Sequence, residues 1–300
     1  MKIGIDIGGS HLAVGLINEE LGIVDKIDET YTLEEKKDLP KTIIEKIKLY
    51  INYLLKRNQL EIGNISIIGI ACPGTIKDGY ILRAGNLAIY NFHIVEELKK
   101  YFSTKMIIRN DAKCAALAEK AIGSLKNYQD SVFLTLGTGI GGAIFLKNYL
   151  LEPKQYSGFE IGHIIIEKNG RKCTCGKRGC FENYASMKAL KEKIKKEYKL
   201  PQETHSKELM EILNNQTEKS NQILEEYLEN LCVGLGILID LFEPEIISIG
   251  GSFAYYETIF LERLKEKMQQ NHRTFNNRKD IKYTLAKMKN DAGIIGSVVI

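Results

Sequence analysis

Three cysteines close together are the residues of this chain best suited to hold a metal ion. Cys173, Cys175 and Cys180 have the spacing C-x-C-x4-C on a glycine-rich loop. Three thiolates at such short spacing can share one cation, and Zn²⁺ favours four ligands in a tetrahedron. His163 is the obvious fourth ligand. Because a Cys3His set leaves no open position for a zinc-bound water, the spacing predicts a structural zinc site whose metal does not itself catalyse.

Two carboxylates flank the predicted zinc site. Glu160 precedes His163 by three residues, and Glu182 follows Cys180 by two residues. A metal that joins the histidine to the cysteine loop would also bring these two carboxylates together, where they could hold a ligand. The alternative is a zinc knuckle that stabilises its loop and has no part in chemistry.

Three glycine turns are candidates for phosphate binding, because glycine lets backbone N–H groups approach phosphate oxygens without interference from a side chain. Each turn alone is more often simply a tight turn. Asp6 strengthens the first, since a carboxylate beside a phosphate-binding turn suits Mg²⁺, and the third would open a helix at a nucleotide pocket. Neither the P-loop nor the Rossmann pattern is present. The turns are Gly8-Gly9-Ser10, Gly137-Thr138-Gly139 and Gly250-Gly251-Ser252.

Asp111 is the candidate general base. Asn110 or Asp111 starts an alanine-rich helix over residues 112–122, directly after a strand that ends at Arg109. The helix dipole favours the charged carboxylate, which is then ready to accept a proton. Such a base contributes about 10²–10⁴-fold in rate. The alternative is that the aspartate merely caps the helix.

The elements that must position these residues follow from hydrophobic spacing and glycine turns. A strand, a glycine turn and a second strand occur twice, which suggests a duplicated lobe. The stretch 75–91, which contains Asn86, is expected to be a loop, and Asp291 is a plausible cap for the last helix. Strands are expected at 2–7, 12–17, 21–27, 65–71, 105–109, 132–136, 143–146, 245–249 and 281–285, and helices at 40–55, 94–101, 112–122, 187–199, 207–213, 221–242, 255–269 and 292–299.

Length and composition indicate a two-lobed globular protein. The 300 residues exceed a usual single domain, and a boundary is expected near residue 115, with lobes 1–115 and 116–288 and residues 289–300 returning to the first lobe. The net charge of +4, from 42 basic and 38 acidic residues, is too balanced to indicate nucleic acid or a membrane as partner. Half of the six cysteines lie in the metal loop, which fits a reducing cytoplasm.

Taken together, these motifs resemble the ROK family of bacterial sugar kinases, repressors and open reading frames. The matching motifs run nearly from end to end of the chain, and the set is specific although no single motif is. They are DIGGS at 6–10, CPGTIKDG at 72–79, GN at 85–86, NDAKCAALAE at 110–119, LGTGIGGA at 136–143, FEIGH at 159–163, CTCGKRGCFE at 173–182 and EPEIISIGG at 243–251.

The resemblance implies an α/β, actin-like ATPase (ribonuclease H-like) fold, with the sugar in a cleft between two lobes, ATP and Mg²⁺ as cofactors, structural Zn²⁺, and usually a homodimer. It implies that Asp6 is associated with Mg²⁺ and that Asp111 is the general base. His163 would place one ring nitrogen on zinc and the other toward the sugar. The phosphates would meet Gly8, Gly9, Ser10, Thr138 and Gly139; Gly250 and Gly251 would edge the adenosine pocket; and Asn86, Asn110, Glu160, His163 and Glu182 would bind sugar hydroxyls.

The expected reaction is transfer of the γ-phosphate of ATP to the 6-hydroxyl of a hexose. The C-T-C-G form of the metal loop resembles that of glucose and N-acetylhexosamine kinases, which favours glucose, followed by N-acetylmannosamine or N-acetylglucosamine. A β-glucoside or fructose is less favoured. Phe159 departs from the small residues common before the glutamate, and the LAIYNF stretch at 87–92 lacks a tryptophan that many relatives carry.

Two other classes of function remain. A sugar-sensing repressor of this family carries a DNA-binding winged helix ahead of the first phosphate turn, whereas Asp6 here is almost the first residue. A catalytically silent sugar- or zinc-binding module would have no need of Asp6 and Asp111.

Overall fold

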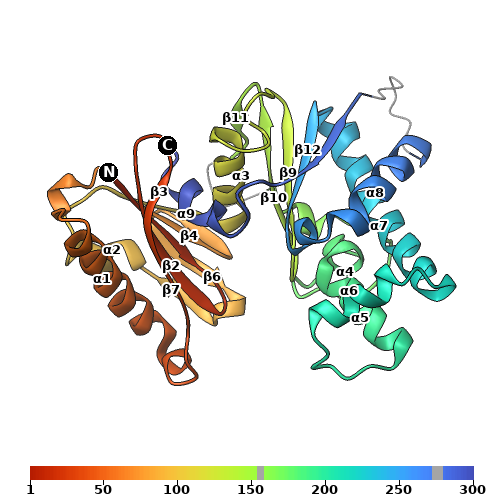
Figure 1. The fold of residues 1–300 in the computed structure, drawn as a ribbon, viewed down its shortest axis with the longest axis horizontal. Helices are drawn as coiled ribbons and strands as arrows, with labels where there is room; N and C mark the ends of the chain where they lie inside the picture. Colours follow the sequence, from red (N-terminus) through yellow and green to blue (C-terminus); the bar gives the residue numbers. More distant parts are fainter. Residues whose placement is uncertain (154–158, 272–279) are drawn as a thin grey trace. The chain divides into compact units, whose positions relative to one another are not determined.

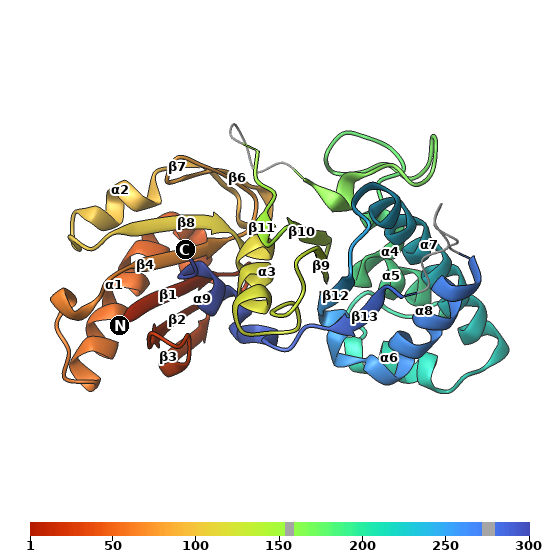
Figure 2. The same cartoon turned by 90° about the horizontal axis from the view of Figure 1, so that it is seen from above.

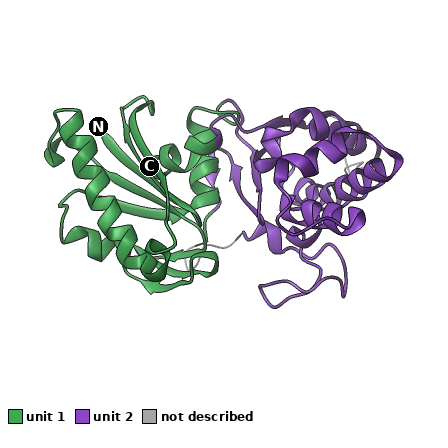
Figure 3. Cartoon of the chain, turned by 60° about the horizontal axis from the view of Figure 1, so that its bottom comes forward, with its two compact units in different colours: residues 1–126, 152–158, 290–300 green, residues 127–151, 159–289 purple. Residues whose placement is uncertain are grey.

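The computed structural model of the protein describes residues 1–153, 159–271 and 280–300, which form two compact units (Figure 3). Unit 1 comprises residues 1–126, 152–158 and 290–300, and unit 2 comprises residues 127–151 and 159–289. The expected division at residue 115 falls inside helix α3 (Asp111–Ala121). The break lies instead after Lys126, because α3 packs against α9 (Ala292–Ser297), which also belongs to unit 1.

The main sheet of unit 1, which Figure 1 shows beside α1, has the strand order β3-β2-β1-β4-β8. Three of its strands form an antiparallel meander, β1 (Lys2–Ile7), β2 (His11–Ile17) and β3 (Ile23–Thr30). Two further strands, β4 (Ile68–Cys72) and β8 (Met106–Asn110), extend the sheet in parallel to β1. Since parallel strands end at the same edge of a sheet, the ends of β1 and β8 place Asp6 and Asn110 at that edge.

Successive residues of β1 face opposite sides of this sheet, and the two sides pack against different helices. The isoleucines of β1 are fully buried in the core under α1 (Leu39–Arg57) and α2 (Ile94–Lys99). Gly4 and Asp6 point to the opposite face, where α9 lies (Figure 2). Period-two alternation therefore separates a packing face from the face that carries the candidate metal-binding aspartate.

The expected loop at 75–91 is wrong. This stretch forms a second, three-stranded sheet from β5 (Thr75–Lys77), β6 (Tyr80–Ala84) and β7 (Ile89–Phe92), with a 3-10 turn at Gly85–Leu87 that contains Asn86. Asp78 and Gly79 have positive φ angles and join the paired residues Lys77 and Tyr80. An Asp-Gly pair at this position is a strong hairpin signal, and it was available in the sequence.

Unit 2 repeats the sheet topology of unit 1. Its strands have the order β11-β10-β9-β12-β13, with β9 (Ser131–Leu136), β10 (Ile140–Leu146) and β11 (Tyr149–Leu150) antiparallel. β12 (Ile246–Gly251) and β13 (Lys282–Leu285) are parallel to β9. The expectation of a duplicated architecture is confirmed, because each unit combines three antiparallel strands with two added parallel strands.

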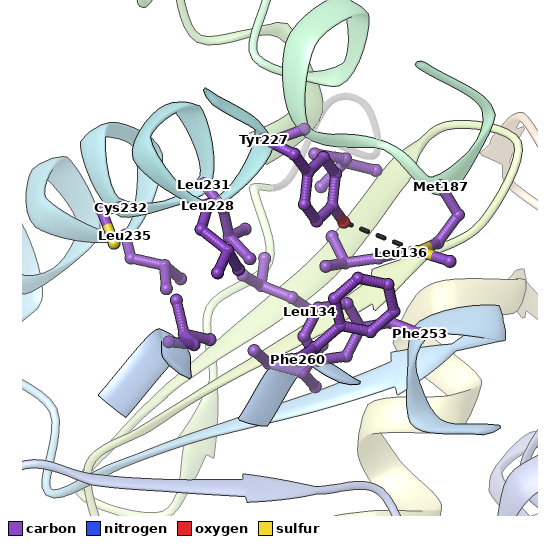
Figure 4. Packing of buried hydrophobic residues seen from close by; sticks show 14 of the residues in the cluster. Leu134, Leu136, Met187, Tyr227, Leu228, Leu231, Cys232, Leu235, Phe253 and Phe260 are labelled. Atoms are coloured by element: carbon purple, nitrogen blue, oxygen red, sulfur yellow. Dashed lines mark hydrogen bonds between the residues drawn. The ribbon is translucent and has the colours of Figure 1, made fainter. Parts of the chain in front are cut away.

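The helices of unit 2 pack on its sheet through one large apolar core (Figure 4). Leu134 and Leu136 of β9 lie in this core, and the rings of Phe253 and Phe260 stack with centroids 4.6 Å apart. The hydroxyl of Tyr227 donates to the sulfur of Met187 at 3.6 Å. The helices are α4 (Glu182–Ala185), α5 (Met187–Tyr198), α6 (Ser206–Asn214), α7 (Glu218–Phe242) and α8 (Glu257–Asn271).

No helix in the described ranges combines the length and the hydropathy that crossing a membrane requires.

Candidate functional site

The first glycine turn lies between β1 and β2 and is held by backbone hydrogen bonds. The amide of Gly8 donates to the carbonyl of His11 at 2.9 Å, and the amide of Tyr31 donates to the carbonyl of Ser10 at 2.8 Å. Gly9 and Ser10 are exposed, and a β-carbon built on Gly9 would lie 3.8 Å from Nδ2 of Asn86. The turn therefore offers open backbone to a ligand, with the Asn86 amide beside it.

His11 is a residue of this turn that sequence reasoning did not single out. Its ring lies against Gly8, since a β-carbon at position 8 would come within 2.6 Å of the imidazole Cε1. A side chain at position 8 would therefore have to displace the His11 ring. The signal in the sequence was the short spacing between this histidine and the glycine pair.

Asp6 is partly buried at the end of β1, on the face covered by α9. Desolvation of the carboxylate, followed by the charges of Asp111 and Asp28, raises the pKa of Asp6 to about 7. Those causes place Asp6 and Asp111 in one electrostatic environment within unit 1. A carboxylate whose ionised form is so disfavoured gains strongly from a nearby cation, so its donor chemistry fits Mg²⁺.

Asn110, not Asp111, is the N-cap of α3. Its Oδ1 accepts from the amides of Ala112 and Lys113 at 3.0 and 3.3 Å, and its Nδ2 donates to the carbonyl of Gly74 at 3.1 Å. Asp111 is the first helical residue, and its Oδ1 accepts from the amide of Ala112 at 2.9 Å. Asn110 is therefore the N-cap residue, and Asp111 adds one hydrogen bond to the amide of Ala112.

The second and third glycine turns lie side by side in unit 2. β9 and β12 are paired so that Gly250 is opposite Thr135 and Gly251 is opposite Leu136, the residue before the second turn. Thr138 and Gly139 therefore lie at the same sheet edge as Gly250 and Gly251. The third turn does not open α8 directly, because a 3-10 turn at Ser252–Tyr255 intervenes.

The four expected metal ligands lie together in unit 2. Nδ1 of His163 and the sulfurs of Cys173, Cys175 and Cys180 fall within one cluster, in which all ligand atoms are within 4.8 Å of one another. Cys175 and Cys180 sulfurs are 3.6 Å apart, and the Cys173 sulfur is 3.6 Å from Nδ1 of His163. In a tetrahedral site with Zn–S near 2.3 Å, neighbouring ligand atoms are about 3.8 Å apart. The donor set and its spacing fit zinc.

Close backbone approaches position the two halves of this cluster. Gly162 lies against the carbonyl of Ile140, where any β-carbon would overlap it, which holds the turn at Ile161–His163 on β10. The amide of Phe181 donates to the carbonyl of Ile164 at 2.9 Å. The buried ring of Phe181 in turn packs against Gly234 of α7. Phe181 thus anchors the two site residues on either side of it, Cys180 and Glu182.

Glu182 joins the metal cluster to the second glycine turn. Its Oε1 lies 3.2 Å from the Cys173 sulfur and 3.5 Å from Nδ1 of His163. A β-carbon on Gly139 would lie 2.7 Å from its Oε2. Glu160 precedes the turn at Ile161–His163 and is exposed. Since Nδ1 of His163 faces the cysteines, Nε2 is the nitrogen left for another partner.

Two sets of expected site residues are therefore grouped, each within its own unit. Unit 1 contains Asp6, the first glycine turn, Asn86, Asn110 and Asp111, and unit 2 contains Thr138, Gly139, Glu160, His163, Glu182, Gly250, Gly251 and the three loop cysteines.

Comparison with known proteins gives relatives over nearly the whole chain. The glucokinase of Thermotoga maritima is 30% identical over 285 residues, which are 89% of this chain and 86% of that protein. The xylose repressor of Caldicellulosiruptor bescii is 28% identical over 99% of this chain and 77% of the repressor. The N-acetylmannosamine kinase of Haemophilus influenzae is 28% identical over 98% of this chain and 93% of the kinase.

Solved structures show the same fold. The ROK family glucokinase of Streptomyces griseus, crystallised with glucose and AMPPNP, superposes with a TM-score of 0.81 at 24% identity, over 99% of this chain and 97% of that one. Lmo2764 of Listeria monocytogenes, described as a candidate N-acetylmannosamine kinase, gives a TM-score of 0.82 at 29% identity, over 99% and 97%. The expected fold class is confirmed. The ROK family model matches residues 2–300, and the chain belongs to the ROK family, with the actin-like ATPase fold of its sugar kinases.

Proposed function

We propose that this protein is an ATP-dependent hexose kinase that phosphorylates the 6-hydroxyl of glucose, with Asp111 as general base. One observation carries the proposal. Asp111 begins α3 without serving as its cap, and its charge raises the pKa of Asp6, so a proton acceptor and a candidate metal carboxylate share one corner of unit 1. A regulator that only senses sugar has no use for this pair of carboxylates.

In the proposed reaction the proton of the sugar hydroxyl passes to the carboxylate of Asp111. The hydroxyl oxygen then forms a bond to the γ-phosphorus of ATP as the bond to the β–γ bridging oxygen breaks, and ADP leaves. The N-terminus of α3 favours the charged form of a carboxylate placed there, which suits a proton acceptor. The second N–H of the Asn110 amide, beside the one donated to Gly74, is suited to hold a sugar hydroxyl in line.

Asp6 would hold Mg²⁺, which when bound neutralises charge on the phosphate oxygens. The exposed backbone of Gly9 and Ser10 and the turn at Thr138 and Gly139 would donate N–H groups to those oxygens, while Gly250 and Gly251 would border the adenosine. These roles rest on the family motifs and on the open backbone of the first turn.

The sugar would be bound from unit 2 by Glu160, Glu182 and Nε2 of His163. Zinc held by His163 and the three cysteines would fix Nδ1 of His163 and therefore the orientation of its ring, as metal ligation commonly does for histidine. The role of zinc in sugar binding would thus be to orient His163, and the metal itself would remain structural. From unit 1, Asn86 would contribute its amide beside the first glycine turn.

Glucose is the favoured acceptor because the glucokinase of Thermotoga maritima is 30% identical to this chain and the metal loop has the C-T-C-G form. N-acetylmannosamine is the second candidate, supported by the Haemophilus influenzae relative. A homodimer in the cytoplasm is part of the same proposal, by analogy with the family. A regulatory role, as in the related xylose repressor, is the main competing function.

The test is an ADP-release assay with purified protein over glucose, mannose, fructose, N-acetylmannosamine, N-acetylglucosamine and a β-glucoside. We expect turnover with glucose that Asp111→Asn lowers by about 10²–10⁴-fold, while equilibrium binding of glucose persists. Glucose binding without turnover in the wild-type protein would favour a regulator. Substantial turnover in Asp111→Asn would remove that residue from its proposed role.

A further inference from the structure

The last helix, α9, lies on a row of glycines that crosses the unit 1 sheet. In the register of the sheet, Gly4 of β1 pairs with Gly15 of β2 on one side and with Gly69 of β4 on the other. β-carbons on Gly4 and Gly69 would overlap the backbone carbonyls of Ile294 and Ser297, and one on Gly15 would lie 2.7 Å from Cγ2 of Ile294. The glycine row is therefore the surface on which α9 rests.

Polar and apolar contacts fix α9 on this row at both ends. Lys26 and Asp291 form an ion pair at 2.8 Å beside the first turn of the helix. At the other end, Nη1 of Arg109 donates to the carbonyl of Val299 at 2.8 Å. Between them Ile294 and Val298 are fully buried against the sheet. A helix held at this many points cannot easily move away from an added side chain.

Two glycines of α9 face the elements that carry Asp6 and Asp111. Gly296 lies so close to the carbonyl of Cys114 in α3 that any β-carbon would overlap it. Gly293 lies against the carboxylate of Asp6, and a β-carbon there would come within 2.5 Å of its Cγ. α9 is therefore packed between the strand that ends near Asp6 and the helix that begins at Asp111.

We propose that Gly293 is a positioning residue for Asp6, because the absence of a side chain at this point of a fixed helix leaves the space in which the Asp6 carboxylate lies. This inference rests on the proposed function for the role of Asp6 toward Mg²⁺. A methyl group at position 293 displaces the carboxylate, since the helix is held by the sheet whereas the end of the Asp6 side chain can rotate.

The first experiment measures Mg²⁺ dependence in Gly293→Ala. We expect the Mg²⁺ concentration for half-maximal activity to rise roughly 10-fold or more, with glucose binding unchanged, as is typical when a residue behind a metal ligand is altered. The readout independent of activity is the rise in melting temperature on adding Mg²⁺ and AMPPNP, which should shrink in the variant. Unchanged Mg²⁺ dependence in both readouts would overturn the proposal.

The matched control is Gly15→Ala, which presses on the same helix through Ile294, away from Asp6. It should lower the melting temperature while leaving the Mg²⁺ response as in wild type. If Gly15→Ala shifts the Mg²⁺ response as much as Gly293→Ala does, the effect comes from general displacement of α9, and Gly293 has no particular relation to Asp6.

A double-mutant cycle with Asp6→Ala tests the contact without reference to catalysis. Truncating Asp6 empties the space that the methyl group needs, so Gly293→Ala should cost several degrees of melting temperature in wild type and much less in Asp6→Ala. If Gly293→Ala alone fails to fold, the double variant should recover a cooperative transition. Equal losses in both backgrounds, or failure of the double variant to fold, would refute the contact. If the wild-type protein has no kinase activity, the proposed function is refuted. The melting temperatures in this cycle would still test the contact between Gly293 and Asp6.

Discussion

Oε1 of Glu182 lies 3.5 Å from Nδ1 of His163, the ring nitrogen that faces the cysteine cluster. The same carboxylate contacts Cys173 and reaches toward the second glycine turn through its other oxygen. One side chain therefore adjoins both the metal cluster and a turn proposed to meet phosphate. A substitution that removes the charge of this carboxylate therefore tests its role in the site.

Replacing Glu182 by glutamine should weaken sugar binding and leave zinc binding unchanged. Glu182→Gln keeps the shape but removes the charge, and a lost charged hydrogen bond costs about 1.5–3 kcal/mol, so the KM for glucose should rise roughly 10–100-fold. Zinc content should remain one ion per chain, because three cysteines and His163 complete the tetrahedron. Elemental analysis checks the metal, and loss of zinc in this variant would show that Glu182 is itself a ligand.

Gly139 and Gly137 form a matched pair of substitutions in one turn. A methyl group on Gly139 would lie 2.7 Å from Oε2 of Glu182 and displace that carboxylate, whereas one on Gly137 meets no atom of the described residues within 4 Å. Gly139→Ala should weaken glucose binding measured without nucleotide, and Gly137→Ala should not. Calorimetric titration of each variant with glucose decides the matter; equal losses would mean that the turn as a whole is sensitive.

Removing zinc should loosen the cysteine loop. Burial raises the pKa of the Cys180 thiol to about 12, so this ligand ionises at neutral pH chiefly when a cation compensates the charge. Dialysis against a chelator should lower the melting temperature and weaken glucose binding, and added Zn²⁺ should restore both. Cys232, buried in the unit 2 core, supplies the control, because Cys232→Ser should retain zinc. Protein purified without chelator that contains no zinc would contradict the site.

Asp6 should make the stability of the metal-free protein depend on pH. Its pKa is about 7 in the folded state against an ordinary value of 3.8, so the folded state binds more protons than the unfolded chain between these values. Stability contributed by the protonated form is therefore lost as pH rises from about 4 to 7 and changes little above that range. Asp6→Asn escapes this loss.

The melting temperatures of wild type and Asp6→Asn, measured without Mg²⁺ from pH 4 to 8, test this account. The difference in favour of the variant should be small at pH 4 and reach several degrees by pH 7.5. The exposed Asp240 provides a control, since Asp240→Asn should show no such trend. A difference that is constant with pH would mean that the Asp6 carboxylate ionises normally.

Local patterns in the sequence were sufficient for most strands of the two five-stranded sheets, the glycine turns and the metal loop. The β-branched run at 2–7 and the glycines after it predict β1 and its hairpin because residues adjacent in sequence decide them. The three cysteines lie within one short loop, so their spacing alone brings three ligands together. The one missed sheet, β5-β6-β7, was also encoded locally, in the Asp78-Gly79 hairpin turn.

Tertiary structure decided the contacts between residues far apart in the chain. That Asn110 caps α3 while Asp111 is its first helical residue depends on where the helical backbone begins after β8, since either residue type can cap a helix. The contact of Gly293 with Asp6 depends on α9 resting on Gly4, Gly15 and Gly69, which align across strands only through the sheet register. Such contacts arise when whole elements pack together. The periodicity of one segment does not specify which other elements that segment will contact.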